Sequence, residues 1–179
     1  YQGTEFWDRS LVDPDNRRPV DYAERRHVLA ELDGPDDDGP EDLPAIGIDG
    51  AAKLLVTTRA LRIRRDHPEL FTRYLELEAT GSAAGHVIAF DRGGAVTIAT
   101  RLPIGLDRVG GWGDTLVHAV PVERIDLLTG RHVPADRGIA LADLLTTYPV
   151  ALLVPADAVG AAGHADAVTI ENVPSWTDR

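Results

Sequence analysis

The chain has 179 residues, of which 44% are hydrophobic, so it is long enough to bury the core of one ordinary domain. Its formal net charge of -11 argues against nucleic-acid and anionic-membrane partners, because both need a basic face. The absence of Cys excludes disulfides and permits a reducing compartment, and no apolar run approaches the roughly 20 residues of a membrane span. We therefore expect a cytoplasmic protein with no nucleic-acid partner and no membrane partner.

Two features predict that the chain is a fragment of a longer protein. It contains no Met. Its first residue is Tyr1, whose side chain is too bulky for routine removal of an initiator Met in front of it. We therefore expect further sequence upstream.

Residues 1–22 combine aromatic, acidic, amide and arginine side chains in one loop-like segment, a mixture that core packing would not select. Residues 1–5 (Tyr-Gln-Gly-Thr-Glu) predict a strand end that runs into a loop, with a plain surface turn as the alternative. Residues 13–16 (Asp-Pro-Asp-Asn) are typical of a turn, because Pro fixes φ and Asp and Asn bond their own backbone. The segment as a whole is typical of a polar ligand site.

Two helices are predicted after this segment. Pro19 suits the first turn of a helix over about residues 20–32, and Asp21 is favourable near its N-terminus. Asp49 is a plausible N-cap for a second helix over about residues 50–66. This second helix carries an apolar stripe that needs a partner surface, formed by Ala51, Leu54, Leu55, Thr58 and Leu61.

Residues 33–44 join the two helices and are rich in acids and prolines. One interpretation is a Ca²⁺ loop, because hard cations prefer clustered carboxylates. The spacing is not that of an EF-hand, however, and Pro, Gly and like charge are typical of a solvated connector. We expect the connector, and no metal site.

From residue 74 onward the apolar period changes from helical to two, which predicts short strands. Residues 92–94 (Arg-Gly-Gly) are typical of a hairpin turn. Short strands with no long helices between them predict an antiparallel sandwich or barrel. The strand candidates are residues 74–78, 86–91, 95–102, 115–120, 124–128, 139–144 and 150–154.

Residues 110–114 (Gly-Gly-Trp-Gly-Asp) place a Trp in a glycine-rich loop. Trp112 could stack on a pyranose ring, because an indole face packs on sugar CH groups. A Trp that anchors the loop to the core is the alternative, and we favour it.

Three motifs together resemble one known family. They are residues 1–5, residues 13–21 (Asp-Pro-Asp-Asn-Arg-Arg-Pro-Val-Asp) and residues 61–71 (Leu-Arg-Ile-Arg-Arg-Asp-His-Pro-Glu-Leu-Phe). They are similar to the maltooligosyltrehalose synthase family of the α-amylase superfamily. The resemblance runs to about residue 153, with one departure: Ile125 stands where the family's pattern leads us to expect Trp.

The resemblance implies an α+β fragment. Residues 1–72 would be the end of a catalytic (β/α)₈ barrel, with its last strand, an active-site loop and helices. Residues 73–156 would be a carboxy-terminal antiparallel β-sandwich, and residues 157–179 are a tail of uncertain structure. The partner would be the missing amino-terminal barrel of the same chain, so we expect residues 1–66 to fold poorly alone, because the helical stripe would face water.

The resemblance also implies a reaction on maltooligosaccharides. The reducing-end α-1,4 bond would become an α,α-1,1 bond by intramolecular transglycosylation, with one carboxylate as nucleophile and another as acid/base. In this family those carboxylates lie upstream of Tyr1, so we expect no catalytic residue and no cofactor in this chain. The side chains expected to bind substrate are Tyr1, Gln2, Glu5, Asp15, Asn16, Arg17 and Arg18. For Arg17 and Arg18 the alternative is a structural salt bridge that closes the loop.

Two other functions stay open from the residues. One is a self-standing β-sandwich that binds glucan, with Trp112 as a stacking platform and Trp7 as a second candidate for that role. The other is a structural domain that only braces its neighbour.

Overall fold

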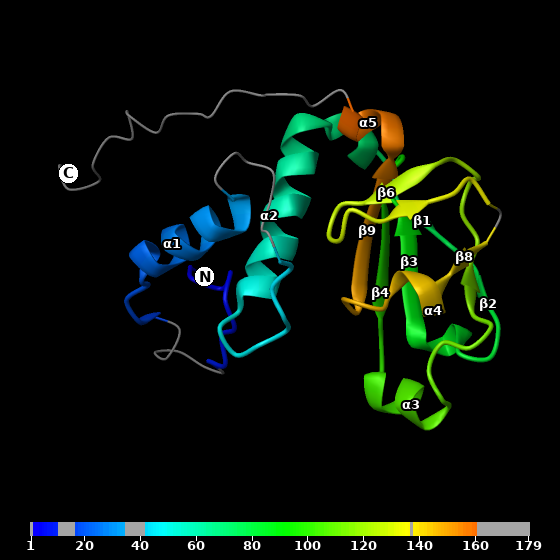
Figure 1. Cartoon of the computed structure of the whole chain (residues 1–179), viewed down its shortest axis with the longest axis horizontal. Coiled ribbons are helices and arrows are strands. Elements are labelled where there is room, and N and C mark those ends of the chain that lie inside the picture. The colour runs from blue at the N-terminus through cyan, green and yellow to red at the C-terminus, as the bar shows by residue number, and fades with distance from the viewer. Residues whose placement is uncertain (1, 11–16, 35–41, 137, 161–179) are drawn as a thin grey trace.

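The computed structural model describes residues 2–10, 17–34, 42–136 and 138–160. Helix α1 (Tyr22–Asp33) and helix α2 (Ala51–Asp66) come first, and the turn η2 (Pro68–Phe71) leads into a β-rich region (Figure 1). The two predicted helices are therefore confirmed.

The two helices begin in different ways. Asp21 is the N-cap of α1, and its Oδ1 accepts a hydrogen bond from an amide of the first turn at 2.9 Å. The cap of α2 is Gly50, at φ 79°, so the prediction of Asp49 is wrong; Asp49 instead accepts from the Ala51 amide at 3.2 Å. Glycine fits because a Cβ at Gly50 would lie 3.0 Å from the Phe6 Cα.

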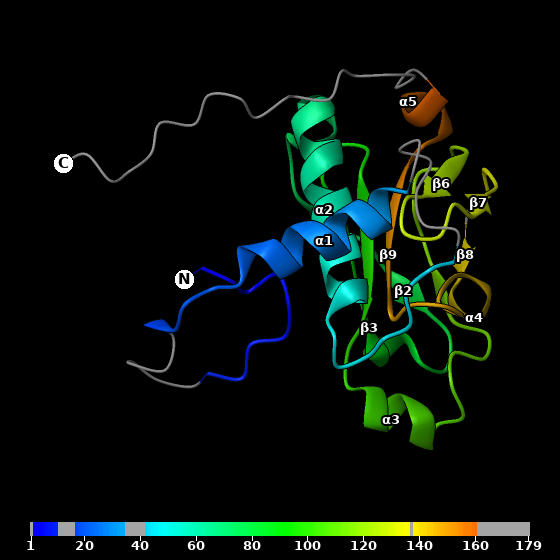
Figure 2. The same ribbon diagram turned by 60° about the vertical axis from the view of Figure 1, so that its left-hand side comes forward.

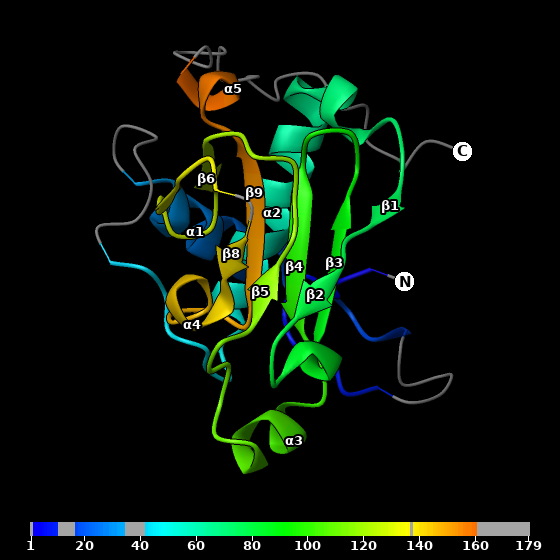
Figure 3. The same ribbon diagram turned by 90° about the vertical axis from the view of Figure 1, so that its right-hand side faces the viewer.

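The β-rich region consists of two antiparallel sheets (Figure 3). The larger has the order β1-β3-β4-β9-β6-β7, and the smaller has the order β2-β5-β8. The larger sheet contains β1 (Leu75–Glu76), β3 (Val87–Asp91), β4 (Val96–Thr100), β6 (Arg124–Asp126), β7 (His132–Val133) and β9 (Val150–Pro155). The smaller contains β2 (Ala79–Thr80), β5 (Leu116–Val117) and β8 (Ile139–Ala140). The short helical segments are η3 (Ala84–His86), α3 (Pro103–Arg108), α4 (Leu141–Leu144) and α5 (Ala156–Gly160).

Strand β9 lies in the middle of the larger sheet, although it is the last of that sheet's strands along the chain. It pairs with β4 on one side, where Leu153 lies opposite Val96. On the other side it pairs with β6, where Val154 lies opposite Ile125. The two halves of the sheet are therefore joined through this one strand.

The turn between β3 and β4 lies at residues 92–94, as predicted. Gly93 and Gly94 have φ values of 121° and 139°, which L side chains rarely adopt. The buried Asp91 carboxylate accepts hydrogen bonds from both amides, at 2.5 and 2.8 Å, and one from Arg73 at 3.1 Å. Burial alone raises the pKa of Asp91, but these donors outweigh it and hold the pKa below its usual value.

Helix α2 lies between α1 and the larger sheet (Figures 1 and 2). Its Leu54 and Leu55 are only 5% and 2% exposed. They belong to one buried cluster with Leu32 of α1 and with Leu152 and Val154 of β9. The expectation that the stripe of α2 would face water in this chain is therefore wrong for its two central leucines, because the larger sheet and α1 cover them.

The predicted stripe is wrong at Leu61, which is 59% exposed. Leu61 follows Leu54 by two helical turns and lies on the same side of the helix, but the described residues cover only Leu54. The buried line instead runs through Ala52, Leu55 and Ile63, at helical spacing.

The other face of the larger sheet packs against the smaller sheet. Val96, Ile98 and Leu153 of the larger sheet share a buried cluster with Val117 and Ile139 of the smaller one. Because successive residues of a strand point to opposite faces, β9 supplies Leu152 to one cluster and Leu153 to the other.

Trp112 is half-buried and packs against this second cluster. Its position agrees with a Trp that anchors the glycine-rich loop, the interpretation that the sequence favoured.

The segment predicted as one strand over residues 139–144 is wrong in its second half. The strand β8 ends at Ala140, and α4 follows directly. Leu141 and Leu144 are both buried, and their spacing of three places them on one side of a helical turn.

The described chain is a small α+β unit with antiparallel sheets, which confirms the coarse fold class. The assignment of its first part to a barrel end and of its second part to a β-sandwich stays a prediction. Among the described residues, no helix has the length and apolar character needed to cross a membrane.

Candidate functional site

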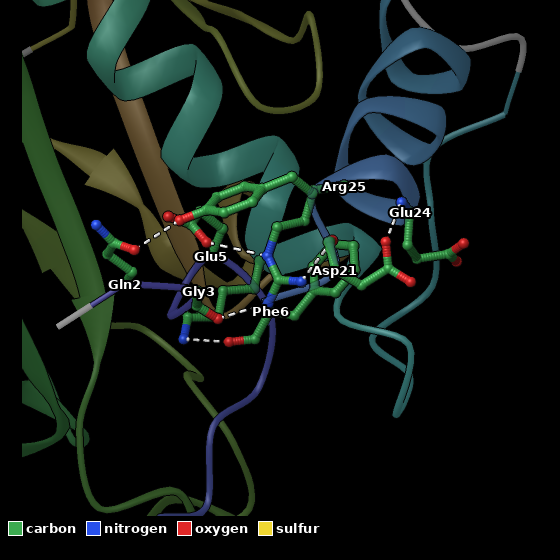
Figure 4. Close-up of polar contacts among 9 residues, drawn as sticks. Gln2, Gly3, Glu5, Phe6, Asp21, Glu24 and Arg25 are labelled. Atoms are coloured by element: carbon green, nitrogen blue, oxygen red, sulfur yellow. Dashed lines mark hydrogen bonds and ion pairs between the residues drawn. The ribbon is translucent and has the colours of Figure 1, made fainter. Parts of the chain in front are cut away.

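Arg25 of α1 binds the segment that opens the chain (Figure 4). Its Nε donates to Oε2 of Glu5 at 3.2 Å, and its Nη2 donates to the backbone oxygen of Gly3 at 2.6 Å. Its Nη1 donates to the backbone oxygen of Asp21 at 2.9 Å, and the guanidinium carbon lies 4.7 Å from the centroid of the Phe6 ring. Arg25 therefore contacts four residues, Gly3, Glu5, Phe6 and Asp21.

A second contact fixes the same segment to the start of α1. The Tyr22 hydroxyl donates to Oε1 of Gln2 at 2.9 Å (Figure 4). The first turn of α1 therefore holds the opening segment through both Tyr22 and Arg25.

Trp7 is held at its edge and on one face. Its Nε1 donates to the backbone oxygen of Gly47 at 2.7 Å. The Lys53 ammonium lies 5.3 Å from the Trp7 ring centroid and donates to the Phe6 backbone oxygen at 2.9 Å. The Trp7 side chain is fixed by two elements distant in the sequence, yet the residue remains 49% exposed.

Asp8 forms a small polar network with Ser10 and Arg18. Its Oδ1 accepts from the Ser10 amide at 2.8 Å and from the Ser10 hydroxyl at 2.6 Å. Arg18 donates to the same hydroxyl at 2.5 Å and lies 3.6 Å from the carboxylate. The bonds from Ser10 hold the pKa of Asp8 below its usual value, so this carboxylate is ionised at neutral pH.

Some of these groups line a cavity of about 340 Å³. Its lining includes Gln2, Trp7, Asp8, Ser10, Arg18 and Arg25. The cavity thus combines hydrogen-bond acceptors and donors with part of an indole surface, a combination that suits a polar ligand with some apolar surface.

The predicted site residues fall into three groups. Gln2 and Arg18 line the cavity, whereas Glu5 is engaged by Arg25. Arg17 is exposed and is not part of the lining. Tyr1, Asp15 and Asn16 lie outside the described residues.

The partners of Arg18 agree with the structural alternative for this residue. Both Ser10 and Asp8 belong to the same loop region, so Arg18 helps to close it. Arg18 also lines the cavity, so its role in ligand binding stays a prediction beside this structural role.

The sequence did not single out Asp8, Ser10 and Arg25 as site residues. The spacing of Asp21 and Arg25, four apart at the start of a predicted helix, suggests a side-chain ion pair, but Arg25 donates to the backbone oxygen of Asp21 instead. Most of the acid-rich connector, residues 35–41, lies outside the described residues, and among the residues that the structure does describe no three His, Asp or Glu side chains gather to hold a metal ion.

Replacing Arg25 by Ala is expected to destabilise the chain by about 2 kcal/mol, because it removes charge-assisted hydrogen bonds and the contact with Phe6. Urea unfolding measures the loss in the free energy of unfolding. In the same variant, the backbone amides of residues 2–10 should exchange faster. Arg26→Ala, on the exposed side of the same helix, is the matched control and should change stability by less than about 0.5 kcal/mol. Unchanged exchange of residues 2–10 in the Arg25 variant would contradict the anchoring role.

No family model matches the chain. It is 41% identical over 161 residues to a protein of Mycobacterium tuberculosis (strain H37Rv) named as a maltooligosyl trehalose synthase, a match that covers 86% of this chain and 18% of the relative. The chain thus spans about a fifth of the length of the curated relatives it matches.

Solved structures give the same family name. The maltooligosyltrehalose synthase of Arthrobacter ramosus is 54% identical, with a TM-score of 0.79 over 86% of this chain and 19% of that one. A structure described as DSM5389 glycosyltrehalose synthase is 22% identical, with a TM-score of 0.60 over 87% of this chain and 18% of that one, and shows likeness of fold alone. The resemblance predicted from the three motifs is therefore confirmed.

Proposed function

We infer that this chain is the carboxy-terminal part of a maltooligosyltrehalose synthase. The observation that carries the inference is its 41% and 54% identity, over 86% of its length, to proteins that bear this name. Residues 1–72 would complete a catalytic (β/α)₈ barrel, and residues 73–156 would form the β-sandwich behind it. The rest of the barrel would come from upstream in the same chain.

The proposed reaction is an intramolecular transglycosylation in the cytoplasm. The reducing-end α-1,4 bond of a maltooligosaccharide would be broken, and the released glucose would attack through its anomeric hydroxyl to form an α,α-1,1 bond. Both steps use retaining glycoside chemistry, with the nucleophile and the acid/base supplied upstream of this chain. Water must be kept out, because hydrolysis competes with the second step.

In this scheme the chain supplies part of the substrate wall. Gln2 and Arg18, which line the cavity, would hydrogen-bond sugar hydroxyls. Glu5 would act through Arg25, which it holds against the same cavity. The remaining proposed wall residues are Tyr1, Asp15, Asn16 and Arg17.

The test is product analysis with the full-length protein and maltopentaose. We expect the reducing end to disappear and a terminal trehalose unit to appear, with only slow release of glucose. The 179-residue chain alone should form no such product, because the reactive carboxylates would be absent.

Two results would overturn the proposal. One is an upstream reading frame that does not encode an amylase-type barrel. The other is trehalose-unit formation by the 179-residue chain without any further part.

A further inference from the structure

We propose that Trp7 and Asp8 form a binding subsite for one glucosyl ring of the substrate, with Lys53 and Gly47 as the groups that position the indole. The inference rests on the proposed function, and it adds residues for which neither the resemblance nor the names of the relatives give a role. It starts from an exposed aromatic ring that is rigidly held.

Trp7 is a half-exposed aromatic ring held by two contacts. An exposed indole with no fixed contacts would lose rotamer freedom on binding, whereas this ring is already fixed by its bond to Gly47 and by the Lys53 ammonium. Trp7 lines the cavity, whereas Lys53, whose ammonium group lies over one face of the ring, does not. The part of the ring that lines the cavity can contact a ligand.

A pyranose ring matches this surface. Its axial CH groups make an apolar face that packs on an indole, while its hydroxyl groups project mainly from the ring edge. Asp8, the next residue along the chain, is ionised and oriented by Ser10, so it can accept hydrogen bonds from hydroxyl groups beside the stacked ring. Arg18 supplies donors on the same wall of the cavity.

The charges around the cavity favour a neutral ligand. Arg18 lies beside Asp8, and the Arg25 guanidinium is occupied by Glu5 and by two backbone oxygens. The cavity volume of about 340 Å³ lies at the lower end of the range for small-ligand sites, roughly 300–1,000 Å³. A neutral, polyhydroxylated ring is therefore a better match than a phosphate or a purely apolar molecule.

The test compares maltopentaose binding and KM in the full-length protein with its Trp7 and Asp8 variants. Trp7→Ala should weaken binding about tenfold, because the stacking surface is lost. Trp7→Phe should stay within about threefold of the unchanged protein, because a flat apolar face remains although the bond to Gly47 is gone. Asp8→Asn keeps the shape of the side chain and should weaken binding about threefold.

Trp112→Phe is the matched control. This tryptophan packs on the second core and does not line the cavity, so its replacement should leave maltopentaose affinity unchanged. If the Trp7→Ala variant does not fold, the Trp7→Phe variant still gives an affinity and a KM to compare with those of the unchanged protein.

The outcomes separate the subsite from the proposed function. If the unchanged protein makes the terminal trehalose unit but the Trp7 and Asp8 variants keep its affinity and KM, the subsite is wrong and the function stands. If the unchanged protein neither binds nor converts maltopentaose, the function fails and the subsite fails with it.

Discussion

Replacing Asp126 by Ala is expected to destabilise the chain by about 4 kcal/mol. The Asp126 side chain is 1% exposed and lies at the end of β6. Its Oδ1 accepts from the amides of Leu128 and Leu152 at 3.1 and 3.0 Å, and its Oδ2 accepts from the Thr129 hydroxyl at 2.6 Å. Truncation would leave buried amide groups without an acceptor, and each such group costs about 1–3 kcal/mol.

Two controls sharpen this test by urea unfolding. Asp126→Asn keeps an acceptor oxygen and should cost only about 1–2 kcal/mol. Asp107→Ala, at an exposed aspartate of α3, should change stability by less than about 0.5 kcal/mol. Equal stability of the Ala variant and the unchanged chain would mean that the carboxylate does not hold β9 and the turn after β6 together.

Replacing Leu55 by Ala is expected to cost about 3.5 kcal/mol, the middle of the range of about 2–5 kcal/mol for a buried leucine. Leu55 lies in the cluster that α2 shares with α1 and the larger sheet, so truncation leaves a cavity there. Leu61→Ala on the same helix is the matched control, because Leu61 is 59% exposed and should change stability by less than about 0.5 kcal/mol.

Amide exchange of α2 gives the second measurement for this pair. We expect strong protection of the helix in the 179-residue chain and reduced protection in the Leu55 variant. Weak protection in the unchanged chain, or equal losses for Leu55 and Leu61, would restore the idea that α2 needs a surface from outside the described residues.

The helices and the hairpin turn were predictable because their signals are local. Asp21 caps α1 through its own side chain, and Gly93 and Gly94 supply backbone angles that other residues avoid. The start of α4 was not predictable, since Leu141 and Leu144 suit either a strand or a helical turn until the core behind them is known.

The site could be predicted only in outline. The polar composition of the opening segment pointed to a ligand cavity, and Gln2 and Arg18 do line one. Two of the anchoring contacts were hidden because their acceptors are backbone oxygens. Arg25 binds the Gly3 oxygen and Trp7 binds the Gly47 oxygen 40 residues away, and side-chain composition gives no sign of such partners.

The central place of β9 has a consequence for synthesis on the ribosome. Strands β3 and β4 can pair as soon as they leave the exit tunnel, and β6 can pair with β7, but each group then exposes an open edge. Only when residues 150–155 emerge can one strand insert and close both edges at once. The nascent β-rich region must therefore stay unfinished, and exposed to wrong pairing, until almost all of the described chain has been translated.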